Sequence, residues 1–217
     1  MDSKRITKTL AAALLLGATT AYADIIFTPN PGSNTGTDNV VFNTCSGIEL
    51  GPALIVQGCL NTDNSIIIDF QGIENLVVNG GQARIESQDG AFDNLTTYID
   101  PLATSAYTSL IFNINTTLGD TGTITINVQP IGEALVSQSF AIAQGQNFFR
   151  IDAINGELIQ SVNFLSTGLG IQSVSFDDVR QVRIGGVSAL PEPGVLGLVG
   201  MVLGAIGLTT RRRERRH

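Results

Sequence analysis

Thr123-Ile124-Thr125-Ile126-Asn127-Val128 is the stretch that decides the fold class. Apolar and polar residues alternate through it, so Ile124, Ile126 and Val128 share one face of an extended chain. This alternation is typical of a strand with one face in a core and the other in water. The stretch therefore predicts a half-buried antiparallel sheet.

Similar short runs lie on both sides of this stretch, and Gly, Asn and Asp separate them. The predicted strands are Val40–Asn43, Ala53–Gln57, Ser65–Phe70, Asn75–Val78, Gln82–Glu86, Thr108–Asn115, Thr123–Gln129, Leu135–Ala141, Asn147–Asp152, Leu158–Phe164, Ile171–Phe176 and Val179–Ile184. No helical periodicity persists between residues 24 and 190. Many strands without intervening helices predict an all-β fold, a two-sheet antiparallel β-sandwich of jelly-roll type. An immunoglobulin-like sandwich is the alternative, but its core tryptophan is missing because the chain has none.

Turn signals support this division into strands. Asn79-Gly80-Gly81 predicts a tight hairpin, and Gly119-Asp120-Thr121-Gly122 predicts a second reversal. Asn155-Gly156 is the preferred pair for a type I′ turn, because both central residues need a positive φ.

The N-terminus has the three parts of a secretory signal peptide. Lys4, Arg5 and Lys8 are basic, Leu10–Leu16 is apolar, and Ala21-Tyr22-Ala23 is an A-x-A cleavage site. Residues 1–23 are therefore predicted to be removed. Residues 24–39 include TPNPGSNTGTDN, which predicts a loose N-terminal arm, and residues 40–188 form the predicted β-domain.

The C-terminus, residues 189–217, also has three parts. Pro191-Glu192-Pro193 precedes the apolar run Gly194–Leu208, and a basic cluster follows, made of Arg211, Arg212, Arg213, Arg215 and Arg216. The run is shorter than the roughly 20 residues of a spanning helix, but two threonines and the arginine stems extend it. The arginines favour a cytoplasmic tail, which places residues 24–190 outside.

This three-part order resembles the PEP-CTERM sorting signal of Gram-negative bacteria. The resemblance implies cleavage near Pro191-Glu192-Pro193 by an exosortase, a membrane protease, and release from an inner-membrane-anchored precursor to the cell surface or the extracellular polysaccharide matrix. A plain C-terminal membrane anchor is the alternative. Residues from Gly145 onward, with the step Phe176-Asp177-Asp178-Val179, also look like the closing strands of jelly-roll ectodomains attached to such tails, which resemble carbohydrate-binding modules.

The charge of the exported segment excludes one class of partner. Between residues 24 and 190 sixteen acidic residues stand against four arginines and no lysine, a net charge of -12. A domain this acidic repels phosphate backbones, so nucleic acid is excluded as a partner.

Two cysteines, Cys45 and Cys59, lie in the exported segment. Export into an oxidising compartment favours a disulfide between them. A zinc site is the alternative, but two thiols without a histidine fall short of four ligands.

The residues needed for common catalytic machinery are absent from the exported segment. Its sequence contains no histidine, since His217 is the only one in the chain. Serine and cysteine triads and histidine zinc sites all need an imidazole. A glycosidase needs only two carboxylates, but sixteen acidic residues supply such a pair by chance. The expectation is a protein that is not an enzyme. Its role is structural or adhesive in the matrix, with a carbohydrate-binding module as the alternative and a glycoside-active enzyme as the third hypothesis.

Sugar sites usually offer an exposed aromatic ring. Tyr98 and Tyr107 are the only exported tyrosines, and of the adjacent pair Phe148 and Phe149 one is expected inside and one outside. These are the only aromatic candidates that the sequence singles out.

Calcium is the cofactor that such an acidic segment could use most readily. Asp177 and Asp178 are the candidate ligands, one expected to face inward and one outward. The alternative is an ion pair of the inward carboxylate with Arg180 or Arg183. Weaker candidates are Asn61-x-Asp63-x-Ser65 and the pair Asp89 and Asp93.

Overall fold

The computed structural model describes residues 24–79, 84–116, 121–167 and 176–190, and all regular elements in these ranges are strands. The strands are β1 (Ile25–Pro29), β2 (Asp38–Val41), β3 (Ala53–Leu60), β4 (Ile67–Asn79), β5 (Arg84–Ser87), β6 (Asn94–Asp100), β7 (Ser105–Ala106), β8 (Ser109–Thr116), β9 (Gly122–Pro130), β10 (Val136–Ile142), β11 (Gly145–Ala153), β12 (Ile159–Thr167), β13 (Phe176–Gly185) and β14 (Ser188–Ala189). The all-β prediction is confirmed.

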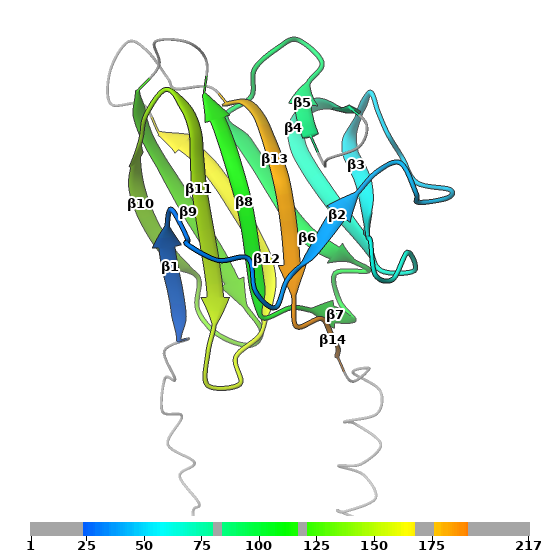
Figure 1. Ribbon diagram of the computed structural model, residues 1–217, viewed down its shortest axis with the longest axis vertical. Helices are drawn as coiled ribbons and strands as arrows, with labels where there is room; N and C mark the ends of the chain where they lie inside the picture. Colours follow the sequence, from blue (N-terminus) through cyan, green and yellow to red (C-terminus); the bar gives the residue numbers. More distant parts are fainter. Residues whose placement is uncertain (1–23, 80–83, 117–120, 168–175, 191–217) are drawn as a thin grey trace, which may run out of the picture.

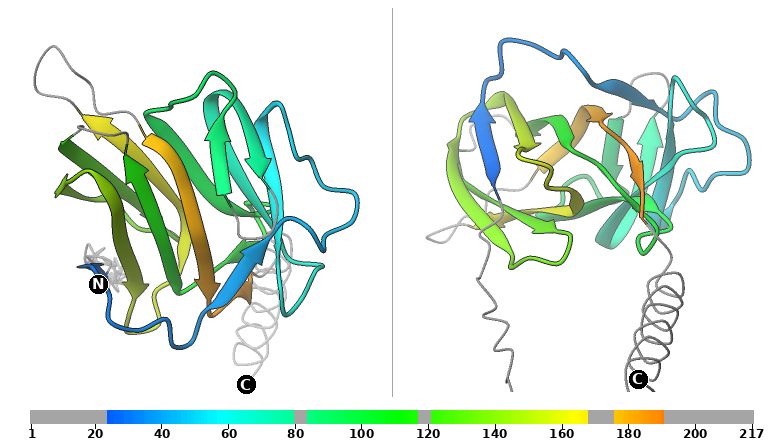
Figure 2. Two further views of the ribbon diagram at one scale, coloured as in Figure 1. Left: turned by 45° about the horizontal axis from the view of Figure 1, so that its top comes forward. Right: turned by 90° about the horizontal axis from the view of Figure 1, so that it is seen from below.

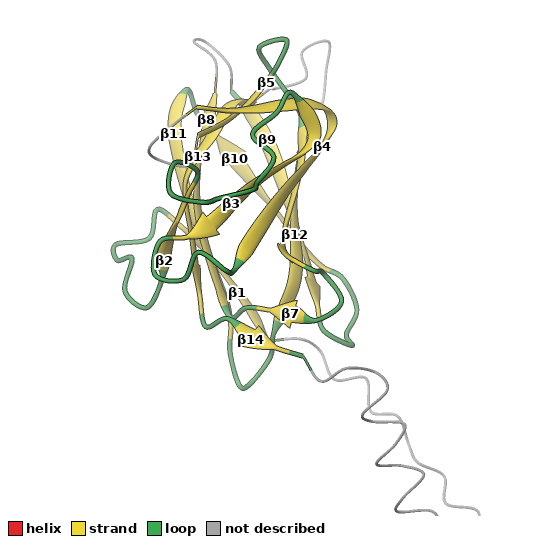
Figure 3. Ribbon diagram, turned by 90° about the vertical axis from the view of Figure 1, so that its right-hand side faces the viewer, coloured by secondary structure: helices red, strands yellow, loops and turns green. Residues whose placement is uncertain are grey.

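Twelve strands form one antiparallel hydrogen-bonded sheet. Its order is β1-β11-β8-β13-β2-β3-β4-β6-β12-β9-β10, with β5 between β4 and β13, while β7 and β14 form a separate pair. The sheet folds over, so that β1, β11, β8 and β13 form a front layer and β6, β12, β9 and β10 a back layer (Figures 1 and 3). Because β2 to β5 carry the hydrogen bonds around one side, the layers are halves of one sheet, and this part of the two-sheet prediction changes.

The core lies between the two layers. Phe112 of β8 meets Phe164 of β12 across it, with ring centroids 4.0 Å apart. Ile124, Ile126 and Val128 are fully buried in the same core, as their alternation predicts. Burial of this apolar surface is the main force that holds the layers together.

The two ends of the sheet, β1 and β10, meet on the side opposite to β2–β5. Phe27 of β1 and Phe140 of β10 have ring centroids 6.1 Å apart. Phe140 also contacts Phe149, at 5.2 Å. Aromatic packing rather than a ladder of hydrogen bonds therefore closes this side.

Two features of the strand prediction need correction. Strand β6 was not predicted, because its inward positions are Leu95, Thr97 and Ile99 and the threonine interrupts the apolar pattern. The predicted strands Ser65–Phe70 and Asn75–Val78 are one strand, β4, in which residues 72–75 bulge away from β3. Residues 171–175 of the predicted Ile171–Phe176 strand lie outside the described residues.

The turn prediction at Asn155-Gly156 holds with one change of context. Asn155 and Gly156 have φ of 56° and 89°, and Glu157 N–H donates to the Ile154 carbonyl, which confirms a type I′ turn. The flanking strands β11 and β12, however, belong to different layers and do not pair. Strands β4 and β5 pair as the predicted hairpin, while residues 80–83 and 117–120 lie outside the described residues.

The N-terminal arm is not loose. Strand β1 pairs with β11 along its whole length, and Ile25 and Phe27 pack against the core. The connection from Asn30 to Thr37 then crosses the outer side of the front layer to reach β2 (Figures 1 and 2). Apolar alternation in Ile25-Ile26-Phe27 outweighs the Pro, Gly and Asn that follow it.

The start of β1 and the end of β14 lie at the same end of the molecule (Figure 1). Strand β14 pairs with β7, and Leu190 N–H donates to the Thr104 carbonyl at 2.7 Å. Regular structure therefore extends to the first residues of the predicted sorting signal.

Candidate functional site

Asp177 and Asp178 lie at a β-bulge where β13 meets β8. Phe176 pairs with Thr116 and Asp178 with Asn115, so Asp177 is the extra residue. Asn115 Nδ2 donates to Asp177 Oδ2 at 3.0 Å. The bulge brings both carboxylates to the outer side of the front layer. Asp178 is fully buried there and Asp177 is half-exposed, so one carboxylate is covered and the other meets water as expected, but not through opposite faces of the strand.

Asp178 is fully buried, and two arginines pair with its carboxylate. Arg180 Nε lies 2.5 Å from Oδ1 and its Nη2 contacts Oδ2, while Arg84 Nε lies 3.1 Å from Oδ2. The hydrogen bonds that Arg180 donates to Asp178 raise the pKa of Arg180. Arg84 also pairs with Glu86, its Nη2 2.5 Å from Oε1, and so bridges two carboxylates on paired strands. The ion pair anticipated as the alternative to calcium is present with Arg180, and Arg84 is a second partner that the sequence did not indicate.

The other arginines of the front layer hold the N-terminal connection. Arg150 donates to the carbonyls of Ser33 and Thr35, both at 3.3 Å, and to Asp152 at 2.7 Å. Arg183 donates to Thr37 through Nε at 3.0 Å and Nη2 at 2.7 Å. All four arginines between residues 24 and 190 thus have protein partners, and we call this outer side of β11, β8 and β13 the arginine face.

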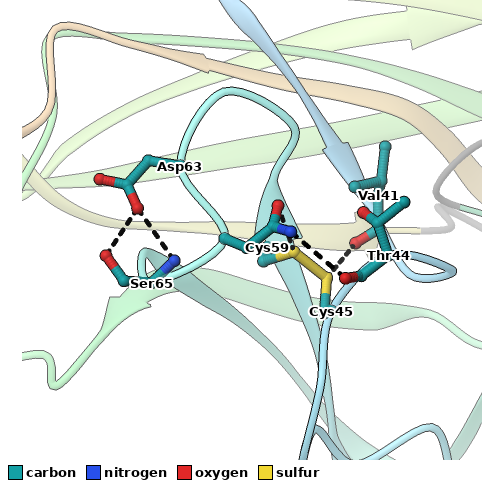
Figure 4. The surroundings of a disulfide bond; sticks show 7 residues. Val41, Thr44, Cys45, Cys59, Asp63 and Ser65 are labelled. Carbon is teal, nitrogen blue, oxygen red and sulfur yellow. Dashed lines mark hydrogen bonds between the residues drawn. A yellow bond between two sulfur atoms is a disulfide. The ribbon is translucent and has the colours of Figure 1, made fainter.

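The weaker calcium candidates have other partners. Asp63 accepts hydrogen bonds from the backbone and hydroxyl of Ser65, and these lower its pKa (Figure 4). Asp89 bonds the Ser87 hydroxyl. Among the described residues, no three His, Cys, Asp or Glu side chains converge as a metal site.

Asp89 lines an open cleft of about 190 Å³ together with Glu74, Asn75, Ser87 and Gln88. Burial and the neighbouring charge of Asp89 raise the pKa of Glu74. The cleft is acidic, but its hydrogen bonds run among its own side chains.

Cys45 and Cys59 are joined in a disulfide, with their Cα atoms 5.9 Å apart (Figure 4). Cys59 is buried in β3, and Cys45 lies in the loop after β2. Asn64 Nδ2 donates to the Thr44 carbonyl at 3.2 Å and adds a second tie to the same loop. The disulfide therefore holds the loop after β2 against β3.

The outer side of the back layer has a different character. Three rows of outward side chains cross its strands, and we call them the polar face. One row is Gln57, Asp69, Tyr98, Ser161 and Gln129; the next is Gln71, Thr96, Asn163, Asn127 and Ser137; the third is Asn94, Leu165, Thr125 and Ser139. No described segment crosses this face (Figure 3).

Hydrogen bonds link the middle row from strand to strand. Asn163 Nδ2 donates to Thr96 Oγ1 and to Asn94 Oδ1, both at 3.0 Å. Asn127 Nδ2 donates to Asn163 Oδ1 at 3.1 Å, and the Ser137 hydroxyl donates to Asn127 Oδ1 at 2.7 Å. The amides are therefore fixed in orientation before any ligand arrives.

Asp69 is the only carboxylate in these three rows, and it is 5% exposed. Gln57 Nε2 donates to it at 2.9 Å, and burial raises its pKa. The pKa of Tyr98 is raised to about 12, first by burial and then by the charge of Asp69 and the hydrogen bond to it. Tyr98 thus stays neutral at physiological pH, and its ring is held at the face.

The remaining aromatic candidates divide between core and surface. Phe149 is buried and Phe148 half-buried, so the predicted inward and outward pair is confirmed. Tyr107 is fully buried, which removes it as a ligand platform.

Sequence reasoning missed the amides of the polar face. The signal was available, because Thr125 and Asn127 alternate with buried isoleucines and Asn163 stands between Val162 and Phe164. The row became visible only with the pairing of β6, β12 and β9, since side chains on separate strands meet through register.

Comparison of the chain with models of known families, with curated proteins and with solved structures finds no match. The signal peptide 1–23 and the sorting residues Pro191, Glu192, Pro193, Arg211, Arg212, Arg213, Arg215 and Arg216 lie outside the described residues. Within the part of the chain that is described, no helix is long and apolar enough to cross a membrane.

Proposed function

We propose that this chain is an exported protein of the cell surface or extracellular matrix, with a structural or adhesive role among exopolysaccharides and no catalysis of its own. The observation that carries the proposal is that β1 begins and β14 ends at one end of the molecule (Figure 1). The predicted export signals join the β-domain at that end, which leaves the outer side of the back layer for a partner. The disulfide of Cys45 and Cys59 fits an oxidising compartment.

Delivery follows the PEP-CTERM resemblance. The precursor is anchored in the inner membrane, an exosortase-type protease cuts near Pro191-Glu192-Pro193, and the β-domain passes to the surface or matrix of a Gram-negative bacterium. Mass spectrometry of surface material tests this, because the mature protein then lacks the arginine tail. An intact Arg211–His217 segment on surface protein contradicts the proposal, and so does unchanged processing in a Glu192→Ala variant.

The scaffold for this role is a jelly-roll-like sandwich. Support comes from the two layers packed through Phe112 and Phe164 and from the antiparallel order of the strands. Such scaffolds present flat sheet surfaces on which binding sites are built.

A carbohydrate-binding module is the second candidate function, and the polar face favours it. Its amides and hydroxyls match the chemistry of sugar hydroxyls, and the arginines lie on the opposite side. A glycoside-active enzyme has less support, because Asp178 is paired with two arginines and Asp177 with Asn115. Release of reducing sugar that is lost in an Asp177→Asn variant would favour the enzyme instead.

A further inference from the structure

We propose that the polar face binds a neutral polysaccharide chain that lies across the strands along Gln71, Thr96, Asn163, Asn127 and Ser137. The inference rests on the proposed function, because the matrix is where the domain would meet such a chain.

The spacing of the row matches the repeat of a polysaccharide chain. Neighbouring strands lie about 4.8 Å apart, so side chains in register repeat at that interval across the sheet. This interval is about the length of one sugar ring in an extended chain. Thr96, Asn163, Asn127 and Ser137 are consecutive members of one row on β6, β12, β9 and β10. Successive sugar units can therefore meet successive side chains.

The asparagines of the row keep unused hydrogen-bonding capacity. Asn127 donates one amide hydrogen to Asn163 and accepts a hydrogen bond from Ser137, so one amide hydrogen and one lone pair remain for a ligand. Asn163 donates both amide hydrogens, to Asn94 and Thr96, but its oxygen keeps one lone pair. Vicinal sugar hydroxyls donate and accept together, which is the pattern that such an amide offers.

The charge of the polar face favours a neutral ligand. It carries no arginine, and lysine is absent from residues 24–190. The segment has a net charge of -12, so an anionic glycan is repelled. A protein partner is disfavoured, because protein interfaces have apolar cores. Within the three rows the only apolar surfaces are Leu165 and the ring of Tyr98. Ile55, which pairs with Gln71, and Ile73, which is 70% exposed, lie on β3 and β4 at one end of the face.

Tyr98 adds an apolar platform beside the amide row. Tyr98 lies on β6, one row away from Thr96, and it pairs with Ser161 and Asp69 on the neighbouring strands. A half-buried ring held by Asp69 can pack against the C–H face of a sugar at little entropic cost.

The test is affinity electrophoresis of the full-length chain in a detergent without a sugar headgroup. The gels contain hydroxyethylcellulose, galactomannan or dextran as neutral probes, or alginate as the anionic probe. We expect retardation by at least one neutral polymer and none by alginate. In an Asn127→Ala/Asn163→Ala variant, loss of two ligand hydrogen bonds lowers affinity by about tenfold.

A matched control is Asn75→Ala, which removes an exposed amide with one side-chain partner, Gln88, away from the face. It should bind as the parent does.

Asn127→Asp keeps the shape of the side chain and adds a charge, so it should also weaken binding. Thermal melts should show that both face variants are folded. Retardation by none of the neutral polymers, equal retardation of the variants, or stronger retardation by alginate overturns the inference. Surface delivery and tail removal are scored separately in the same variants, so failure of binding is distinguishable from failure of sorting.

Discussion

The two outer sides of the folded sheet differ in what their polar side chains bind. The arginine face carries three of the four exported arginines and receives Arg84 from β5, and the N-terminal connection covers part of it. The polar face carries amides and hydroxyls, one buried carboxylate and no covering segment among the described residues. The charges therefore bind the chain to itself on one side, while the other side keeps bonding capacity for a partner.

This difference predicts that substitutions on the arginine face lower stability, whereas substitutions on the polar face lower binding. The largest effect is expected at Asp178. Replacement by Ala leaves Arg84 and Arg180 without their shared carboxylate, and loss of one partner of a buried ion pair costs about 3 kcal/mol. Urea titration of the full-length chain measures it.

Asp177→Ala is the matched control for Asp178→Ala. Asp177 is half-buried and accepts one hydrogen bond, from Asn115, so its loss should cost about 1 kcal/mol. Equal losses in the two variants would contradict the assignment of Asp178 as the charge that holds this face.

The contact between the N-terminal connection and the arginine face can be broken at Gly185. A Cβ there would lie 2.2 Å from the Gly36 carbonyl oxygen, so Gly185→Ala must push the connection outward. We expect a loss of about 2 kcal/mol, with new protease cleavage between Asn30 and Thr37. Gly32→Ala is the control, since a Cβ at Gly32 meets nothing within 4 Å; if it is cut as readily, the connection is not packed as described.

Arg183→Ala tests the same contact from the side of the cation. The guanidinium donates to Thr37 at two atoms and to Asn39, and its removal frees the end of the connection. A loss of about 1.5 kcal/mol is expected, because the bonds are charged but partly open to water. Hydrogen exchange should rise at residues 37–39. Unchanged exchange there would show that β1 and β2 hold the connection without the arginine.

The two faces also differ in how far the sequence predicts them. Alternation in Thr123–Val128 predicts a buried face correctly, because burial is encoded in neighbouring residues. The amide row of Thr96, Asn163 and Asn127 depends on which strands pair, which no local pattern encodes. The Asp177 bulge likewise reverses a correct local rule, since one extra residue against Asn115 changes the side to which a carboxylate points.

The smallest stability effect is expected on the polar face, at Asp69. Burial raises the pKa of its carboxyl above the ordinary value of 3.8, so the folded state holds the proton more tightly than the unfolded state. The stability that Asp69 contributes is therefore fully present below pH 3.8 and is lost as the pH rises through the raised folded pKa. Asp69→Asn removes this titration and keeps an acceptor for Gln57. At pH 7 the variant should equal or exceed the parent in stability, by less than about 1 kcal/mol, and its advantage should shrink as the pH falls towards 3.

Asp63→Asn gives the opposite trend and so calibrates the measurement. Hydrogen bonds from Ser65 lower the pKa of Asp63, so its contribution is present above pH 3.8 and is lost as the pH falls through the lowered folded value. Urea titrations of the parent and both variants from pH 3 to pH 7 compare the two slopes. The opposite outcome is a parent that is more stable than Asp69→Asn at pH 7 and loses this advantage on acidification. It would show that the fold stabilises Asp69 as a charge. The polar face would then hold an ionic site rather than the neutral surface on which a neutral polysaccharide is expected to lie.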